Sequence, residues 1–208
     1  MKKLISLFMA AMLLCGVATN SFAAEEDFNL IDYVEDTKIN SYSEFLSVLD
    51  DNNCGSGVSM STYSLRYLSD QEEYFSVEID YENSTVEVDV VYDLTNSNVA
   101  STRASTRSGV AVHETYSDAG VLIYTVTVNG TFTYTSNTCT ITSKSGTFVK
   151  GRFSFWSSTP TISSGYFSAT QAYARIAGTA MMLTQSSSYC LILMCNTSGS
   201  LSSTFTRS

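Results

Sequence analysis

One segment near the start of the chain has the hydrophobic spacing of a helix. Ser41 followed by Glu44 forms a capping box. The apolar positions that follow recur every three or four residues, at Tyr42, Phe45, Leu46 and Leu49. This pattern predicts a short amphipathic helix that ends in the polar run of residues 50–53.

A second segment alternates apolar and polar residues, from Phe75 to Tyr81 and again from Val86 to Tyr92. The alternation predicts a β-hairpin with its turn at residues 82–85. If Tyr81 faces Val86, the apolar side chains share one face of the hairpin. The other face then sets Asp80 opposite Glu87 and Glu78 opposite Asp89.

The four hairpin carboxylates have three interpretations. They are a hydrated surface, a site for a hard cation such as calcium, or a contact for a basic partner, which includes the chain's own basic half. Hydration is the simplest of the three, and the chain has no Asp-x-Asp-x-Asp-Gly loop. We therefore expect no dedicated metal site and no cofactor, and keep Glu78, Asp80, Glu87 and Asp89 as weak metal candidates.

The rest of the chain has the alternation and turn spacing of an all-β domain, with strands expected at residues 110–116, 121–134, 139–142, 147–156, 169–183 and 189–195. Asn129-Gly130 would normally mark a hairpin, but folding there would set apolar against polar residues, so we expect one straight strand with Gly130 at a bend or a close approach. A row of mostly small residues from Ala172 to Met182 would let a second sheet approach closely.

These patterns predict a mainly β protein. Its expected parts are a signal peptide at residues 1–23, an acidic helix and β-hairpin region at 24–94, a Ser/Thr-rich linker at 95–108 and an antiparallel β-sandwich domain at 109–208. The signal consists of Lys2 and Lys3, an apolar run to Ala18 and small residues before a cut after Ala23. The apolar run is too short to span a membrane comfortably, and we expect no transmembrane segment after cleavage.

Charge divides the remaining chain into two halves. Residues 24–93 contain 18 acids and 2 bases, whereas residues 94–208 contain 2 acids and 7 bases. The net charge of −9 for the whole chain argues against a nucleic-acid partner. Arg103 and Arg107 in the linker leave two possibilities open, an intact flexible connection or a pro-region that an Arg-specific protease removes.

Four cysteines remain after signal cleavage, at positions 54, 139, 190 and 195. Export favours disulfides over metal thiolates. Cys190 and Cys195 are five apart on an expected strand and so point to opposite faces, which leaves Cys139 to pair with one of them, and we choose Cys195. Reduced thiols remain an alternative.

No constellation of residues in the sequence indicates catalysis. The one histidine, His113, is adjacent to Glu114 on an expected strand, and the two side chains would point to opposite faces. The hairpin carboxylates have a spacing that would suit glycoside hydrolysis but lack a pocket. Because the sequence also has no phosphate loop, Cys-x-x-Cys or zinc signature, we expect no catalytic residues.

Aromatic residues gather on both sides of the expected loop at residues 157–165. Phe153 and Phe155 share one face of an expected strand, so we expect them to be buried. Trp156 ends that strand on the other face, and Tyr166 follows the loop. Trp156 and Tyr166 are therefore our candidates for contact with a sugar or peptide ligand.

Residues 109–202 resemble a group of small uncharacterised secreted proteins from Gram-positive gut bacteria. The resemblance is carried by Thr125 to Tyr134, Cys139, the alanine-alternating strand and the segment from Cys195 to Ser202. It implies secretion and a β architecture, and it brings no known activity, catalytic residue or ligand. Cys190 departs from the pattern of that group.

The sequence therefore favours a secreted or cell-wall-associated, non-enzymatic protein that binds a cell-wall polymer, glycan or protein through its sandwich. The alternatives are an effector or toxin-like domain released from an acidic pro-region and, last in order, a glycan-active enzyme that uses the hairpin carboxylates.

Overall fold

The computed structural model describes residues 28–54, 71–95, 104–183 and 185–208. This part of the chain contains two helices and nine strands and is mainly β, as predicted. The elements are α2 (Leu30–Asp36), α3 (Tyr42–Asp51), β1 (Glu72–Asp80), β2 (Thr85–Asp93), β3 (Ser105–Ser117), β4 (Leu122–Tyr134), β5 (Cys139–Lys150), β6 (Thr161–Ser168), β7 (Gln171–Met182), β8 (Gln185–Asn196) and β9 (Leu201–Arg207).

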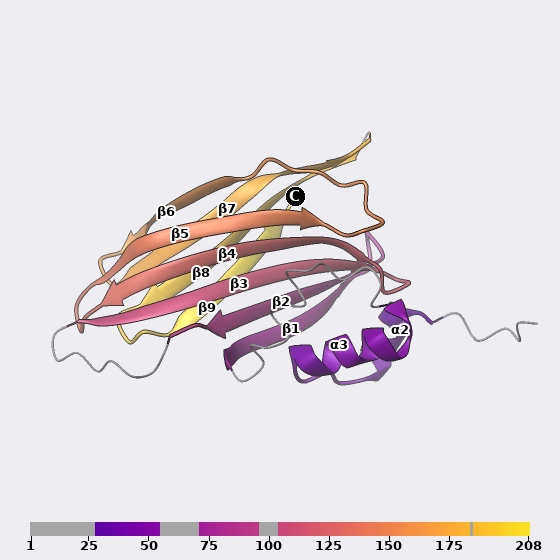
Figure 1. Cartoon of the computed structure of the whole chain (residues 1–208), viewed down its shortest axis with the longest axis horizontal. Coiled ribbons are helices and arrows are strands. Elements are labelled where there is room, and N and C mark those ends of the chain that lie inside the picture. Colours follow the sequence, from indigo (N-terminus) through magenta and orange to yellow (C-terminus); the bar gives the residue numbers. More distant parts are fainter. Residues whose placement is uncertain (1–27, 55–70, 96–103, 184) are drawn as a thin grey trace, which may run out of the picture.

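The strands form two antiparallel sheets that face each other as a β-sandwich (Figure 1). The five-stranded sheet has the order β1-β2-β3-β4-β5, and the four-stranded sheet has the order β6-β7-β8-β9. Every neighbouring pair is a hairpin of strands consecutive in sequence. The residues 151–160 cross from the five-stranded sheet to the four-stranded sheet.

Small side chains let the two sheets approach closely, as the sequence predicts. Ala172 and Ala174 of β7 are fully buried between the sheets. At Gly130, inside β4, a Cβ atom would lie 3.3 Å from the Cβ of Ala174 and 2.7 Å from the ring of Phe132. Gly130 is thus a point of close approach within one straight strand, which confirms the prediction against a hairpin there.

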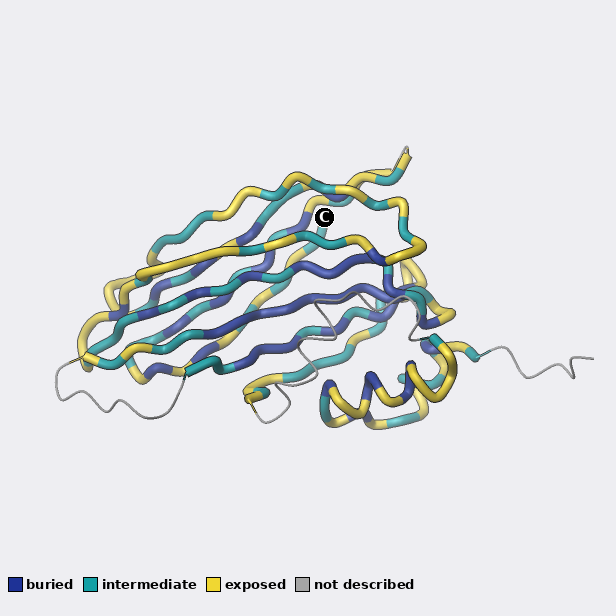
Figure 2. The backbone as a smooth tube through the Cα atoms, in the orientation of Figure 1, coloured by how far each residue is buried: buried dark blue, intermediate teal, exposed yellow. Residues whose placement is uncertain are grey.

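The two helices cover the outer face of the five-stranded sheet, opposite to the face that meets the second sheet (Figures 1 and 2). Ser41 caps α3, where its Oγ accepts a hydrogen bond from the Glu44 amide at 3.2 Å, so the predicted helix is confirmed. Phe45 is fully buried against Tyr116, with ring centroids 5.2 Å apart. No helix among the described residues is long and apolar enough to cross a membrane.

The acidic hairpin is part of the sandwich. β2 pairs with β3 along its whole length, from Thr85 opposite Ser117 to Asp93 opposite Gly109. The predicted linker is wrong at residues 105–108, which lie in β3. Arg107 of this segment forms ion pairs with Glu73 and, at 3.1 Å, with Asp93. Residues 1–23 and 96–103 lie outside the described residues.

Three strand predictions differ from the structure. The strands expected at residues 139–142 and 147–156 are one continuous strand, β5, which ends at Lys150. β6 occupies part of the segment predicted as a loop, and β9 has no counterpart in the prediction. Both β6 and β9 are edge strands with many exposed positions, so they lack the apolar alternation that marks a half-buried strand.

Candidate functional site

The hairpin carboxylates lie beside the edge strand β9, but with a register that differs from the prediction. Glu78 pairs with Glu87, Asp80 with Thr85 and Ser76 with Asp89. The turn therefore occupies residues 81–84, one residue earlier than predicted. The Asp80 carboxylate fixes it there, because it accepts hydrogen bonds from the Asn83 amide at 3.1 Å and from Asn83 Nδ2 at 2.8 Å.

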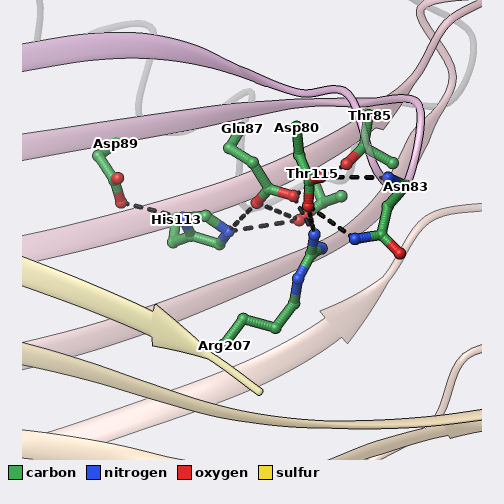
Figure 3. Close-up of polar contacts among 8 residues, drawn as sticks. All are labelled: Asp80, Asn83, Thr85, Glu87, Asp89, His113, Thr115 and Arg207. Carbon is green, nitrogen blue, oxygen red and sulfur yellow. Dashed lines mark hydrogen bonds and ion pairs between the residues drawn. The ribbon is translucent and has the colours of Figure 1, made fainter.

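His113 of β3 lies between two of these carboxylates (Figure 3). Its Nε2 is 2.6 Å from Glu87 Oε2, and its Nδ1 is 3.0 Å from Asp89 Oδ1. Burial alone would lower the pKa of His113, but the hydrogen bonds and charges of Asp89 and Glu87 raise it above its usual range. The two carboxylates therefore favour the protonated form of His113, in which both ring nitrogens donate.

Strand β9 of the other sheet closes this cluster. The ring of Phe205 stacks on the imidazole of His113 with centroids 3.3 Å apart and planes 8° apart. Arg207 donates to Glu87 Oε1 at 2.8 Å and forms an ion pair with Asp80. Burial would raise the pKa of Glu87, but His113 and Arg207 outweigh burial and lower it.

Three of the four weak metal candidates are therefore paired with the chain's own basic groups. Asp80, Glu87 and Asp89 each contact His113 or Arg207, and Glu78 is exposed at the same edge. This matches the third interpretation of the carboxylates, a contact with the basic half of the chain. Among the residues that the structure describes, no group of three or more His, Cys, Asp or Glu is arranged to hold a metal ion.

Thr115, His113 and Asp89 contact one another in the order of a catalytic triad: hydroxyl, imidazole, carboxylate. The Thr115 hydroxyl lies 3.3 Å from His113 Nε2, whose ring contacts Asp89. However, that hydroxyl donates to Glu87 Oε2 at 3.0 Å, and Thr115 and His113 are each 1% exposed. His113, Glu87 and Asp89 line a pocket of about 230 Å³. A nucleophile needs a free base, however, and both ring nitrogens of His113 are already paired with carboxylates. The cluster acts instead as an ion-pair network between the sheets.

His113 and Glu114 point to opposite faces, as predicted. Glu114 is fully buried beneath α3, where it accepts hydrogen bonds from the hydroxyls of Tyr42 and Tyr116, each at 2.7 Å. Thr125 donates to the other carboxylate oxygen at 3.3 Å. This network ties the helical layer to the sheet.

The predicted aromatic candidates lie far apart. Trp156 precedes Ser157, which forms a β-bridge with Met181 near the end of β7. Tyr166 on β6 pairs with Ala172 at the start of β7. The two positions on β7 are nine residues apart, which is about 30 Å along a strand. The structure thus does not join Trp156 and Tyr166 in one site.

The neighbours of Trp156 are Phe153 and Phe155, whose predicted burial is wrong. Phe153 is 59% exposed and Phe155 is 79% exposed. Both were assigned to a strand, but β5 ends before Gly151, where a Cβ would lie 1.8 Å from the carbonyl oxygen of Leu122. Only glycine fits there, and the chain leaves the sheet and exposes the two rings.

Trp156 itself is half-buried and rests edge-on against Tyr124, with ring centroids 6.3 Å apart. Beside it is a pocket of about 210 Å³ at this end of the sandwich. Apolar residues dominate its lining, which includes Leu122, Ile123, Phe153, Phe155, Trp156 and Met182. We call this the aromatic end. The sequence signal that could have located it is Gly151, which interrupts the strand pattern.

Cys139 and Cys195 are both buried in the core between the sheets. Burial and the neighbouring Cys139 thiol raise the pKa of Cys195 to about 12. Cys190 points away from this core, where its Sγ lies 3.1 Å from Arg175 Nε, so the expected opposite orientation of Cys190 and Cys195 is confirmed. The four described cysteines are free thiols, and the Cys139–Cys195 disulfide stays a prediction.

No family model, curated protein or solved structure matches this chain.

Proposed function

We propose that this protein is an exported, non-enzymatic binding protein whose sandwich presents the aromatic end to its ligand. The observation that carries the proposal is the exposure of Phe153 and Phe155 next to an apolar pocket on a segment fixed by the backbone of β4. Exposed aromatic rings beside a pocket are typical of ligand contact. The signal-like residues 1–23 support a role outside the cell, secreted or at the cell wall.

The position of Gly151 supports a preformed site. Its amide donates to the Ile123 carbonyl at 2.9 Å, which ties the start of the segment to β4. The Ser157–Met181 pair holds the other side with two backbone hydrogen bonds of 2.9 and 2.8 Å. A segment held at both sides loses little conformational freedom when a ligand binds.

The same structure argues against two alternative functions. Release of the C-terminal region by a cut after Arg107 would remove β1 and β2 from a sheet to which they are paired, together with the partners of His113 and Arg207. A glycan-active enzyme would need a hairpin carboxylate free to move a proton, yet Asp80 and Glu87 are paired with Arg207.

The test is sedimentation of the purified, exported protein with envelopes isolated from cells that export it. Wild type should pellet with the envelopes, and Phe155→Ser should reduce the bound fraction at least about tenfold, because burying one large apolar side chain contributes enough for that change. Tyr166→Ser is the matched control, since Tyr166 is 58% exposed at the other end of the sheet. Equal binding of all three proteins would contradict the proposal.

A further inference from the structure

The aromatic end continues onto the tip of the β7–β8 hairpin. The backbone bonds between Ser157 and Met181 set the segment that carries Phe155 and Trp156 beside the end of β7, and Met182 lines the pocket together with Phe153 and Phe155. Met181 is 53% exposed and Leu183 is 97% exposed. Phe153, Phe155, Met181 and Leu183 are thus exposed on two adjacent segments, and we call them the apolar rim.

This rim consists of protruding side chains rather than an enclosed cavity. Leu183 is almost wholly in solvent and has φ +54°, and Phe155 is exposed on the neighbouring segment. A small soluble ligand is best held by a concave site that surrounds it. Apolar side chains that project from loop tips are instead buried when they enter a broad apolar medium.

Basic residues flank the rim. Lys150 and Arg152 are exposed on either side of Gly151, and the Arg152 guanidinium lies 5.5 Å from the centre of the Phe153 ring. The one acidic residue in the neighbouring β3–β4 turn is Asp118. Cations beside apolar tips match the lipid phosphates that surround the acyl region of a bilayer. Trp156 lines the pocket beside Phe153 and Phe155, and tryptophan favours the lipid–water interface.

We infer that the apolar rim docks the protein onto a phospholipid bilayer surface, with Phe155 and Leu183 inserted and Lys150 and Arg152 at the phosphates. This inference rests on the proposed function, because it names the partner of the same aromatic end. The docking is peripheral and reversible. Its main contribution is apolar insertion, and the two cations add a smaller part that salt weakens.

Trp156 is the only tryptophan of the chain, so its fluorescence reports on this site alone. The experiment titrates the exported protein with vesicles of equal parts phosphatidylcholine and phosphatidylglycerol. The emission of Trp156 should shift to shorter wavelength and be quenched by bromine-labelled acyl chains. The double variant Phe155→Ser/Leu183→Ser should bind at least about tenfold more weakly.

Tyr166→Ser is again the matched control and should bind as wild type does. Because all variants share the same N-terminus, any contribution of residues before the sandwich cancels in the comparison. An unchanged far-ultraviolet spectrum and thermal midpoint would show that the double variant folds, as expected for two exposed positions.

The outcomes separate this inference from the proposed function. If vesicles leave Trp156 unchanged while envelope binding still depends on Phe155, the partner is a wall polymer, glycan or protein and the lipid inference is overturned. If vesicle binding is equal in wild type and the double variant, the rim is not the docking surface. If neither vesicles nor envelopes bind, both proposals fail.

Discussion

His113 connects the two electrostatic halves of the chain through a single buried side chain. Its partners Glu87 and Asp89 come from the acidic half, and its stacking partner Phe205 comes from the basic half. The sequence places His113 and Glu114 on opposite faces correctly, because that follows from strand alternation. The sequence could not identify Arg207 as the partner of Glu87, since the two residues are 120 positions apart and the edge strand β9 has weak periodicity.

The His113 cluster makes stability depend on pH. A histidine whose pKa is raised on folding stabilises the protein below its unfolded pKa, near 6.5, and loses this contribution as pH rises through the folded pKa. We predict that the thermal midpoint falls as pH rises above about 6.5. The variant His113→Gln should lose this dependence, as measured by thermal unfolding across pH. If the thermal midpoint falls equally with rising pH in wild type and in His113→Gln, the ion-pair assignment is contradicted.

The pKa shift of Glu87 affects stability at acidic pH, and its direction is opposite to that of the His113 shift. The pKa of Glu87 is lowered on folding, so its contribution is present above its unfolded pKa and is lost as pH falls through the folded value. Acid unfolding of Glu87→Gln should therefore depend less steeply on pH than that of wild type below about pH 4. Glu78→Gln, which alters the exposed neighbour of Glu87, serves as the control and should behave as wild type.

The connection between the sheets begins at Gly151. A Cβ there would meet the carbonyl oxygen of Leu122 at 1.8 Å, and a backbone atom cannot move aside as a side chain can. We expect Gly151→Ala to reduce the free energy of unfolding by about 1–3 kcal/mol, as overpacking does, and to alter the emission of Trp156.

Gly165→Ala is the control for this prediction, because a Cβ at Gly165 would meet only the far end of the Tyr173 ring. Denaturant unfolding of the two variants measures the difference. Equal stability would mean that the connection adapts and that Gly151 does not fix the aromatic end.

The elements that the sequence predicts well are those with one buried face. Helix α3, the strands of the acidic hairpin and the central strands β3, β4, β7 and β8 all match their patterns. β6 and β9 were missed because edge strands expose alternate positions and carry Ser and Thr there. The register of the hairpin was wrong because Asp80 caps its turn, a local hydrogen bond that alternation does not encode.

The burial of Phe153 and Phe155 was wrong for a related reason. Alternation beyond Lys150 continues in the sequence, but the sheet does not, because Gly151 packs on the backbone of β4. Trp156 was identified as a ligand candidate from its position at a strand end. Its neighbour Met182 comes from the end of β7, which lies beside it only in the folded protein.

The acidic and basic halves of the chain fold into one body, and this limits where a protease can cut the chain. Arg107 lies in β3 with its guanidinium paired to Glu73 and Asp93, so a protease would reach this bond only after local unfolding. We predict that the exported protein begins at Ala24. Intact-mass analysis of the protein from medium and wall fractions measures this. A mass that begins at Ser108 would contradict it.

The same mass measurement tests the predicted disulfide. Cys139 and Cys195 are neighbours in the core, and their oxidation would link β5 of one sheet to β8 of the other. In an oxidising compartment we expect the unreduced protein to be lighter by the hydrogens of one disulfide. A mass equal to that of the reduced chain would leave these residues as buried thiols.

If the aromatic end is the binding surface, a bound partner covers Trp156, so the accessibility of Trp156 reports on binding there. Acrylamide quenching of Trp156 is measured in the exported protein, alone and with envelopes from cells that export it. We predict that envelopes protect Trp156 from acrylamide and that Phe155→Ser removes this protection. Quenching that stays the same while the protein is bound to envelopes would place the binding surface elsewhere and contradict the claim.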